Sequence, residues 1–218
     1  MVVSSFSRTS RRAASNAGDS IRVIGVNLLR SRLVLAAVVL AALGQVSLRS
    51  ETRPINVEQS TVTVFVYKSG FFSALADDHI IKAPIASGSI SEDAPRSVEI
   101  RVRAAELRVL DPKLAPDRRA DVQARMIGPD VLDVARFPEI TFASTSIEPA
   151  SSDRWNVTGR LTIRGERKTI SFPVRRENNR YRGEVAIKQR DFGIEPIRIA
   201  AGAVKVKDEL KIQFEIVK

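Results

Sequence analysis

Hydrophobic and polar residues alternate through most of this chain after residue 60. At residues 97–103, Val98, Ile100 and Val102 are separated by charged residues, so one face of the segment is apolar and the other is charged. The same period of two runs through residues 61–67, 140–142, 155–163, 168–175, 181–187 and 210–217. Such alternation predicts half-buried β-strands, about eight in all.

Residues 115–127 interrupt the strand pattern and predict a helix. Pro116 suits its first turn, and Ala120, Ala124 and Ile127 lie close to helical spacing. Gly128 is expected to end the helix. The fold class is therefore mainly β, with one or two short helices.

The strand pattern favours an antiparallel barrel or sandwich. A buried parallel sheet would need continuous hydrophobic strands alternating with helices, which this sequence lacks. The face opposite the apolar one carries Arg101, Lys168 and Lys211, so it belongs in water rather than in the lipid of an outer membrane. A closed barrel of about eight strands encloses space for its own side chains or for one small ligand.

The first 44 residues differ from the rest of the chain. They hold six Arg and a single acidic residue, Asp19, and residues 33–43 form an uncharged apolar run (LVLAAVVLAAL). This layout is typical of a secretory signal peptide, and the run is about half as long as a membrane-crossing helix of roughly 20 residues. We interpret residues 1–44 as a signal peptide or N-terminal membrane anchor, residues 45–56 as a short linker, and residues 57–218 as one domain.

Composition narrows the chemistry. The chain has no Cys and one His, which excludes disulfides, thiol nucleophiles, Cys-based metal sites and sites built from several His. Without residues 1–44 the formal net charge falls from +10 to about +5, and the remaining Lys and Arg form no concentrated run. We therefore expect no metal site and no nucleic-acid partner.

Three motifs occur in order along the second half of the chain. They are residues 137–142 (FPEITF), residues 155–165 (WNVTGRLTIRG) followed by Thr169 and Ile170, and residues 190–194 (RDFGI). Together they resemble the YceI-like family over about residues 57–218. The resemblance implies an extended, lipocalin-like antiparallel barrel, here of eight strands, which is usually exported to the bacterial periplasm. It also implies a lumen that binds a long polyisoprenoid chain, such as that of a quinone.

The ligand is expected to contact apolar residues that face the lumen. Most of them stand on the apolar phase of the predicted strands, one lies in the apolar loop before His79, and one lies in the last motif. The predicted lumen residues are Phe72, Ile100, Phe142, Trp155, Leu161, Phe172, Val185, Phe192 and Phe214.

The sequence thus predicts a non-catalytic, exported protein that sequesters or carries an apolar, polyisoprenoid or quinone-like lipid, without any other cofactor. It would reside in the periplasm, or face it from a membrane anchor if residues 33–43 are not cleaved. Transient contact with a membrane surface and a homodimer are compatible with this interpretation. Two alternatives stay open: a filled-core barrel that acts as an envelope-stress or protein-interaction module, and an enzyme that uses Asp77, Asp78 and His79.

Overall fold

The computed structural model describes residues 51–69, 78–199 and 204–218. Residues 50–218 form one compact unit. The strands in the described part are β1 (Thr52–Pro54), β2 (Thr61–Ser69), β3 (His79–Lys82), β4 (Ile85–Ser91), β5 (Ser97–Arg103), β6 (Arg108–Val109), β7 (Glu139–Ser151), β8 (Arg154–Ile163), β9 (Glu166–Glu177), β10 (Arg180–Lys188), β11 (Arg198–Ile199) and β12 (Val204–Val217). The helical segments are the 3₁₀ turns η2 (Ala104–Glu106) and η3 (Gln189–Phe192) and the helix α2 (Pro116–Ile127).

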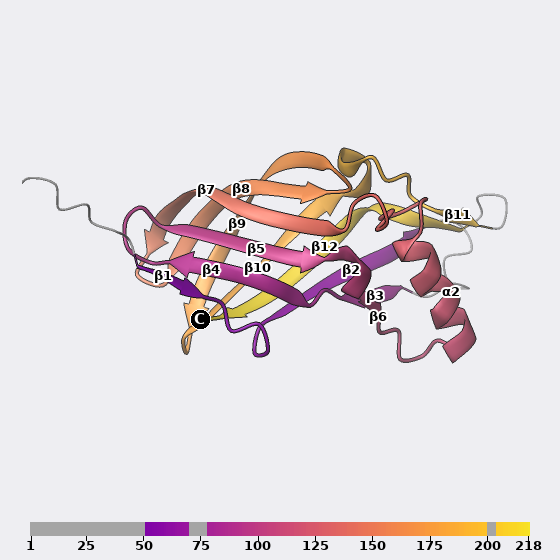
Figure 1. Cartoon of the computed structure of the whole chain (residues 1–218), viewed down its shortest axis with the longest axis horizontal. Helices are drawn as coiled ribbons and strands as arrows, with labels where there is room; N and C mark the ends of the chain where they lie inside the picture. The colour runs from indigo at the N-terminus through magenta and orange to yellow at the C-terminus, as the bar shows by residue number, and fades with distance from the viewer. Residues whose placement is uncertain (1–50, 70–77, 200–203) are drawn as a thin grey trace, which may run out of the picture. The chain divides into compact units, whose positions relative to one another are not determined.

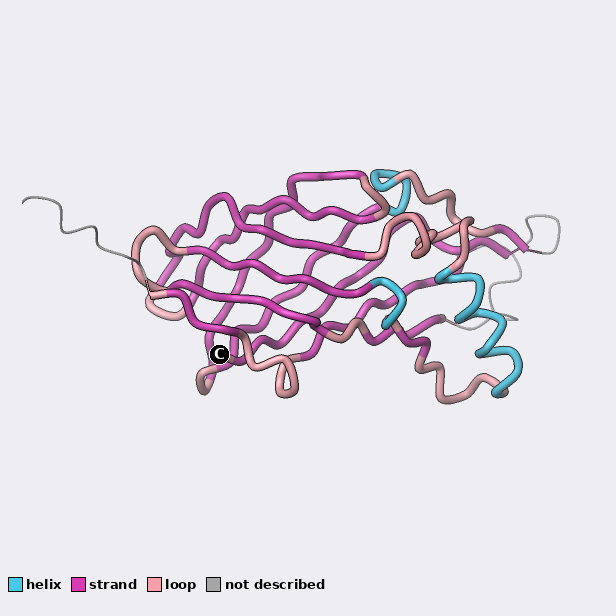
Figure 2. The backbone as a smooth tube through the Cα atoms, in the orientation of Figure 1, coloured by secondary structure: helices cyan, strands magenta, loops and turns pink. Residues whose placement is uncertain are grey.

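The strands form one antiparallel sheet that curls into a barrel (Figure 1 and Figure 2). Neighbours follow the order β4, β5, β7, β8, β9, β10, β12, β2, β3. β3 runs into β4 through Ala83 and Pro84, so residues 79–91 act as one bent strand that pairs first with β2 and then with β5. At the bend, the Ala83 amide donates to the Val62 carbonyl oxygen across 2.9 Å. The sheet therefore closes on itself with eight strands, counting the bent one once.

The predicted fold class is confirmed, and the strand count differs only in how the strands are divided. The seven alternating segments correspond to β2, β5, β7, β8, β9, β10 and β12. The eighth strand of the barrel is the bent pair β3–β4, and the short strands β1, β6 and β11 pair with β4, β3 and β12.

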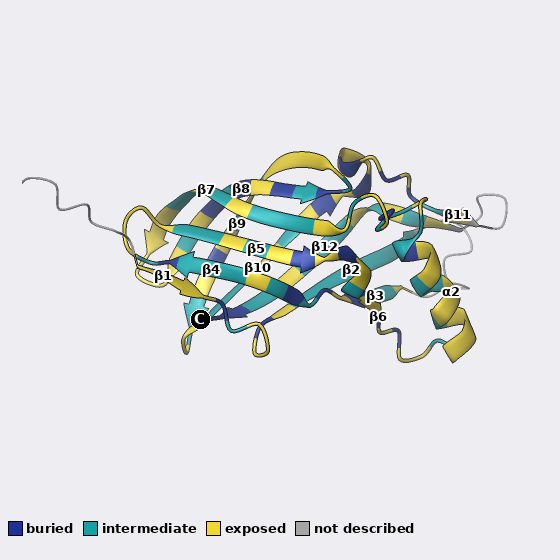
Figure 3. Cartoon of the chain, in the orientation of Figure 1, coloured by how far each residue is buried: buried dark blue, intermediate teal, exposed yellow. Residues whose placement is uncertain are grey.

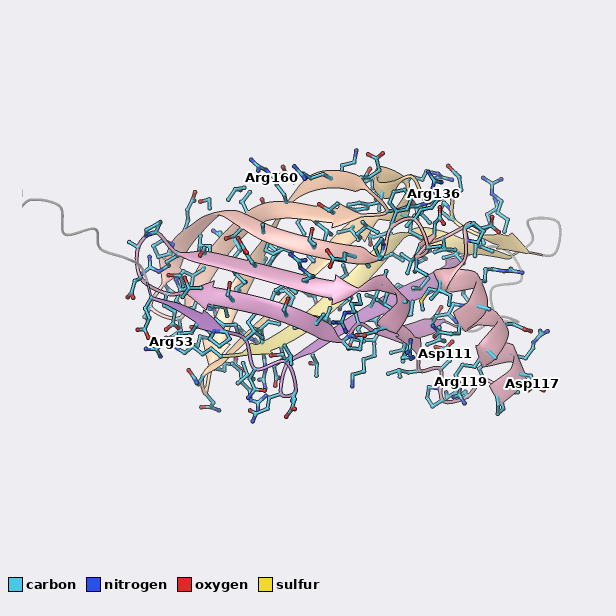
Figure 4. The ribbon with its side chains drawn as sticks, viewed as in Figure 1. Arg53, Asp111, Asp117, Arg119, Arg136 and Arg160 are labelled. Carbon is cyan, nitrogen blue, oxygen red and sulfur yellow. The ribbon has the colours of Figure 1, made fainter. Side chains whose placement is uncertain are left out.

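The alternation places the apolar face of each strand inside the barrel. Along β8, Val157, Leu161 and Ile163 are buried, whereas Arg154 and Arg160 are exposed. Figure 3 shows the same alternation of buried and exposed positions along several strands, and Figure 4 shows Arg160 projecting from the barrel. The charged face thus meets water, as predicted.

The hairpin between β8 and β9 turns at Arg164 and Gly165. Both residues have positive φ angles, 51° and 79°, as a two-residue type I′ turn requires. Gly165 is suited to this position because it has no Cβ to clash in the left-handed region. The tight turn fixes the register of β8 against β9, from Arg154 opposite Arg175 to Ile163 opposite Glu166.

The connection from β5 to β7 carries η2, β6 and α2. The side chain of Gln123 attaches α2 to this connection, since its Oε1 accepts from the Val109 amide (2.9 Å) and its Nε2 donates to the Leu107 carbonyl (2.8 Å). The predicted helix is therefore present, but its packed face is Met126 with Val122, whereas Ala120 and Ala124 are exposed. Ile127, which the sequence placed on the apolar face, also packs against the buried cluster, whereas the two alanines face outward. No helix in the described part of the chain is long and apolar enough to cross a membrane.

Gly159 on β8 makes a close approach that the barrel requires. A Cβ at this position would lie 2.4 Å from Cζ of Phe142 and 2.7 Å from the carbonyl oxygen of Ala143. Gly159 pairs with Ser144 of β7, next to an irregularity between Ser144 and Ser146. The absence of a side chain at Gly159 thus leaves room for the Phe142 ring beside β8.

Replacing Gly159 with Ala is expected to lower the free energy of unfolding by about 2 kcal/mol, because the ring and the backbone oxygen must both move. Urea denaturation followed by circular dichroism measures the change. Arg160→Ala, at the adjacent exposed position on β8, is the matched control and should change stability by less than about 0.5 kcal/mol. Equal midpoints for the two variants would contradict the close approach.

Candidate ligand-binding cavity

The barrel encloses an apolar cavity with a volume of about 470 Å³. Its wall is built from the inward residues of the strands, and its size lies in the range of about 300 to 1,000 Å³ that is typical of small-molecule sites. The apolar wall includes Val62, Val64, Val98, Ile100, Ile140, Phe142, Ile147, Trp155, Val157, Leu161, Ile170, Phe172, Val174, Val185, Ile212 and Phe214.

Three aromatic rings from different strands meet in the cavity wall. The centroid of Phe172 lies 5.5 Å from that of Phe142 and 5.4 Å from that of Phe214, in tilted and edge-on geometry. Phe214 covers Gly183 as Phe142 covers Gly159, because a Cβ at Gly183 would lie 2.5 Å from Cζ of Phe214. The two glycines therefore seat the outer rings of the row, which forms a continuous apolar surface for a ligand.

The charged residues that line the cavity come from one end of the barrel. They are Glu92 and Arg96 in the β4–β5 turn and Arg176 near the end of β9. Figure 1 shows β1 and the C-terminus at this end and α2 at the other. We call this charged end the mouth.

Glu92 is the centre of the polar contacts at the mouth. Its carboxylate accepts a hydrogen bond from the Tyr181 hydroxyl and pairs with the Lys218 ammonium. Arg176 lies 3.8 Å from the same carboxylate and forms a closer pair with Asp153, at 2.9 Å. These contacts join the β4–β5 turn to β9, β10 and the last residue of the chain.

Trp155 stands between the polar mouth and the apolar wall. Its ring lies 5.9 Å from the Tyr181 ring, and the Arg176 guanidinium lies 5.7 Å from its centroid in cation–π geometry. Arg96, by contrast, has no ion-pair partner among the described residues and is exposed. The mouth therefore offers a guanidinium and an aromatic face to a polar group.

On the outside of the barrel beside the mouth, Glu215 lies between two arginines. A hydrogen bond from Arg182 (2.7 Å) and another from Arg180 lower the pKa of Glu215 below its ordinary value. Glu215 therefore keeps its negative charge. Arg182 also pairs with Glu177 at 2.8 Å, so the two arginines face two carboxylates.

The opposite end of the cavity is closed. Ala83, Val102, Leu107 and Ile163 line it there, and all four are buried. They belong to a packed cluster that also contains Met126 of α2, together with Leu132, Phe192 and Ile194. We call Ala83, Val102, Leu107 and Ile163 the floor.

The structure brings most of the predicted lumen residues together. Ile100, Phe142, Trp155, Leu161, Phe172, Val185 and Phe214 all line the cavity. Phe192 lies instead in the packed cluster, 1% exposed, because it stands in η3 after the end of β10 rather than on a strand. Phe72 lies outside the described residues. Contact of these residues with a ligand stays a prediction.

Asp78 and His79, two residues of the predicted acid/base cluster, have different hydrogen-bond partners in the structure. His79 Nδ1 lies 2.6 Å from Oδ2 of Asp111, a residue 32 positions away, and Oδ1 of Asp111 accepts from the Ile80 amide at 2.8 Å. Asp78 instead accepts from the Lys68 amide at 3.1 Å, and Asp77 lies outside the described residues. Figure 4 shows Asp111 near α2, at the end of the barrel away from Arg53.

The His79–Asp111 pair connects two segments that are distant in the sequence. Asp111 is 4% exposed and joins the start of β3 to the chain leading into α2. Neither residue lines the cavity. Within residues 51–69, 78–199 and 204–218, no three His, Cys, Asp or Glu side chains gather as a metal site would require.

Sequence reasoning missed the polar residues of the mouth. Glu92 and Lys218 lie at the ends of strands and carry no periodic signal, so nothing in the pattern joins them to Tyr181. Tyr181 could have been found, since it shares the inward phase of Val185 on β10. Because a buried Tyr hydroxyl usually has a hydrogen-bond partner, a polar residue could then have been expected at that end of the barrel.

Comparisons with known proteins agree with this architecture. A model of the YceI-like domain matches residues 54–218. Among solved structures, the chain is similar to BcnA of Burkholderia cenocepacia, with a TM-score of 0.58 and 21% identity over 74% of this chain and 98% of that one. It is also similar to a polyisoprenoid binding domain from Saccharophagus degradans implicated in plant cell wall breakdown, with a TM-score of 0.53 and 13% identity over 75% and 95% of the two chains. No curated protein matches the chain.

Proposed function

The chain belongs to the family of the YceI-like domain, and from this premise we propose that it binds an apolar lipid of the polyisoprenoid or quinone class in its barrel cavity. The proposal is for a binding protein that sequesters or carries this lipid and catalyses no reaction on it. One of the solved structures with the same fold is described as a polyisoprenoid binding domain, which supports this ligand class.

The observation that carries the proposal is the division of the cavity into an apolar wall, a closed floor and a charged mouth. A prenyl chain has no hydrogen-bonding groups, so an apolar wall is the surface it requires. Each methylene group removed from water contributes about 0.8 kcal/mol to binding. A chain that enters tail first would leave its polar head beside Trp155, Arg96 and Glu92.

The chemistry of the wall supports binding rather than catalysis. General acid–base catalysis needs a titratable side chain within hydrogen-bond reach of the reacting group. Along the wall below the mouth the side chains are hydrocarbon apart from the Thr141 hydroxyl, and the His79–Asp111 pair lies elsewhere. A lipid tail in the cavity would meet packing surfaces and no reactive pair.

The test is native mass spectrometry of the full chain produced in a bacterial host, followed by organic extraction of the purified protein. We expect an added mass that extracts as a prenyl lipid. Trp155 is the only Trp in the sequence, so adding a short-chain quinone to the delipidated protein should change its fluorescence. A bare mass together with unchanged fluorescence would contradict the proposal and favour a filled-core module with a protein partner.

Export to the periplasm is the second part of the proposal. It is supported by the Arg-rich start and the apolar run at residues 33–43. Fractionation of cells that express the full chain should recover it from the periplasm, either shortened near residue 44 or retained on the membrane. Recovery of the unshortened chain from the cytosol would contradict export.

A further inference from the structure

The outer surface of β8 and β9 gathers arginines that are separated in the sequence. The alternation of the strands turns four of them outward, and all four are exposed: Arg154 and Arg160 on β8, and Arg167 and Arg175 on β9. The register of the two strands places Arg154 opposite Arg175 and sets Arg160 diagonal to Arg167. We call these four arginines the cationic face; Figure 4 shows Arg160 on it.

Most of the cationic face has no acidic partner. Elsewhere on the barrel, outward cations are paired across strands, as Arg101 of β5 is with Glu139 of β7 at 3.1 Å. Arg154, Arg160 and Arg167, by contrast, form no ion pair and no side-chain hydrogen bond within the part of the chain that the structure describes. Cross-strand pairing therefore neutralises the cations between β5 and β7 but not those between β8 and β9.

The position of Arg154 opposite Arg175 is unfavourable for the sheet. Like charges directly opposite each other on antiparallel strands destabilise their pairing. Glu177 pairs with Arg175 at 3.2 Å, and Glu148 of β7 stands opposite Asn156 rather than opposite an arginine. An anionic partner that covered the face would reduce this repulsion. The arrangement therefore indicates a surface that binds anions.

The cationic face borders a stretch of the barrel where β9 and β10 are not paired. The two strands pair over only four residues each, which end at Val174 opposite Gly183. Pro173, whose nitrogen carries no hydrogen, follows directly on β9 and has no partner in β10. Beyond this point β9 pairs with β8 alone and β10 with β12 alone. We call this stretch, residues 169–173 and 184–188, the seam.

Residues on both sides of the seam line the cavity. They are Ile170 and Phe172 on β9 and Val185 on β10. A prenyl tail that moved sideways between the two strands would leave the barrel beside the cationic face while its head stayed at the mouth. A lipid bilayer combines an anionic surface with an apolar interior that can take up such a tail, and this favours a membrane as the partner of the face.

We propose that the cationic face docks the barrel on an anionic lipid bilayer, with the seam turned toward the membrane. The choice of a bilayer rests on the proposed lipid cargo, whereas the unpaired arginines do not depend on it. Each Lys or Arg close to an anionic membrane surface strengthens binding by about fivefold, so the three unpaired arginines together contribute about 100-fold.

The experiment measures binding of the full chain to vesicles by sedimentation. One set of vesicles contains equal parts of phosphatidylcholine and phosphatidylglycerol, and the other contains phosphatidylcholine alone. The salt concentration is about 0.1 M, where charges further apart than about 10 Å are largely screened. We expect binding to the anionic vesicles to be at least about tenfold tighter. Equal binding to the two sets, or none to either, would overturn the docking and leave the proposed function standing.

The double variant Arg160→Glu/Arg167→Glu should bind the anionic vesicles at least about tenfold more weakly than the wild type. The matched control is Lys113→Glu/Arg118→Glu, which changes the net charge equally at exposed positions beside and within α2 and should lose less than about threefold. All variants share residues 1–44, so any contribution of that segment cancels. Equal losses in the two double variants would overturn the role of the cationic face.

Two checks keep this comparison interpretable. Arg160 and Arg167 do not line the cavity, so their double variant should still copurify with prenyl lipid, and docking and lipid binding are thus measured separately. If the circular dichroism spectrum shows that the Glu variant is unfolded, Arg160→Gln/Arg167→Gln takes its place, again with an expected loss of at least about tenfold.

The absence of Cys from the chain allows a second, local readout. Thr169, exposed and opposite Arg160, is replaced with Cys and labelled with an environment-sensitive fluorophore; Ala120→Cys on α2 is the matched control. We expect the fluorescence to rise with anionic vesicles in Thr169→Cys and to stay unchanged in Ala120→Cys. A rise in the control alone, or in neither, would overturn docking through this face. Displacement from the vesicles by duplex DNA at an equal phosphate concentration would overturn the choice of a bilayer and indicate a general polyanion site.

Discussion

Replacing Phe172 with Asp is expected to reduce lipid binding by at least about 100-fold. Phe172 is the middle ring of the aromatic row, between Phe142 and Phe214. A carboxylate at this position would lose its hydration whenever a lipid tail filled the cavity, and burying an unpaired charge costs far more than the lost ring contacts. The measurement is the amount of lipid that copurifies with the full chain, together with the Trp155 fluorescence titration.

The neighbouring residue provides the control for this prediction. Ser171 is exposed on the outward phase of the same strand, so Ser171→Asp adds the same charge outside the barrel and should bind lipid as the wild type does. Phe172→Gln, which is polar but uncharged, serves if the Asp variant fails to fold, and a loss of at least about tenfold is expected. Normal binding by either folded Phe172 variant would exclude the cavity as the lipid site.

Replacing Asp111 with Ala is expected to lower the free energy of unfolding by about 3 kcal/mol. The change leaves the Ile80 amide without its acceptor and His79 without its partner, in a region where Asp111 itself is almost fully buried. Removing one partner of a buried hydrogen-bonded group costs the desolvation of what remains. Urea denaturation of the full chain measures the loss.

The matched control is Asp121→Ala, which removes an exposed carboxylate from α2 and should change stability by less than about 0.5 kcal/mol. The single His of the sequence gives a second readout, because its ring protons produce one identifiable set of NMR signals. These signals should move in Asp111→Ala and stay in place in Asp121→Ala. Equal stability of the two variants would show that the pair does not stabilise the connection between β3 and the chain leading into α2.

The barrel was predictable from sequence where one face of a strand meets the cavity and the other meets water. Residues 154–163 and 166–177 show this contrast, so their strands and their inward residues followed from the pattern. The bent strand β3–β4 did not, because Pro84 and Gly88 interrupt its alternation and its two halves pair with different neighbours. A pattern read along one segment contains no information on such a change of partner.

The candidate site was likewise predictable from sequence only in part. Its apolar wall followed from phase alone, since every inward residue of a small barrel faces the same interior. The mouth did not, because the contact of Glu92 with Tyr181 joins residues 89 positions apart. The floor depended on the connection between β5 and β7, whose packing places Leu107 at the end of the cavity. The sequence pattern placed Phe192 in the lumen because the residue is aromatic. Nothing in the pattern showed that Phe192 follows the end of a strand.

The pairing of β2 with β12 has a consequence for the order of folding. β2 is the first long strand of the barrel and β12 the last, and the Ser60 hydroxyl exchanges hydrogen bonds with Val217 across a separation of 157 residues. Contacts between such distant parts of a chain form slowly, because a long loop must close before they contribute. β7, β8, β9 and β10 can pair in sequence as they emerge, but the wall around the cavity is complete only after β12 has inserted between β10 and β2. The enclosed cavity therefore exists only after synthesis of the whole barrel, and a chain that lacks β12 has two unpaired strand edges, those of β10 and β2.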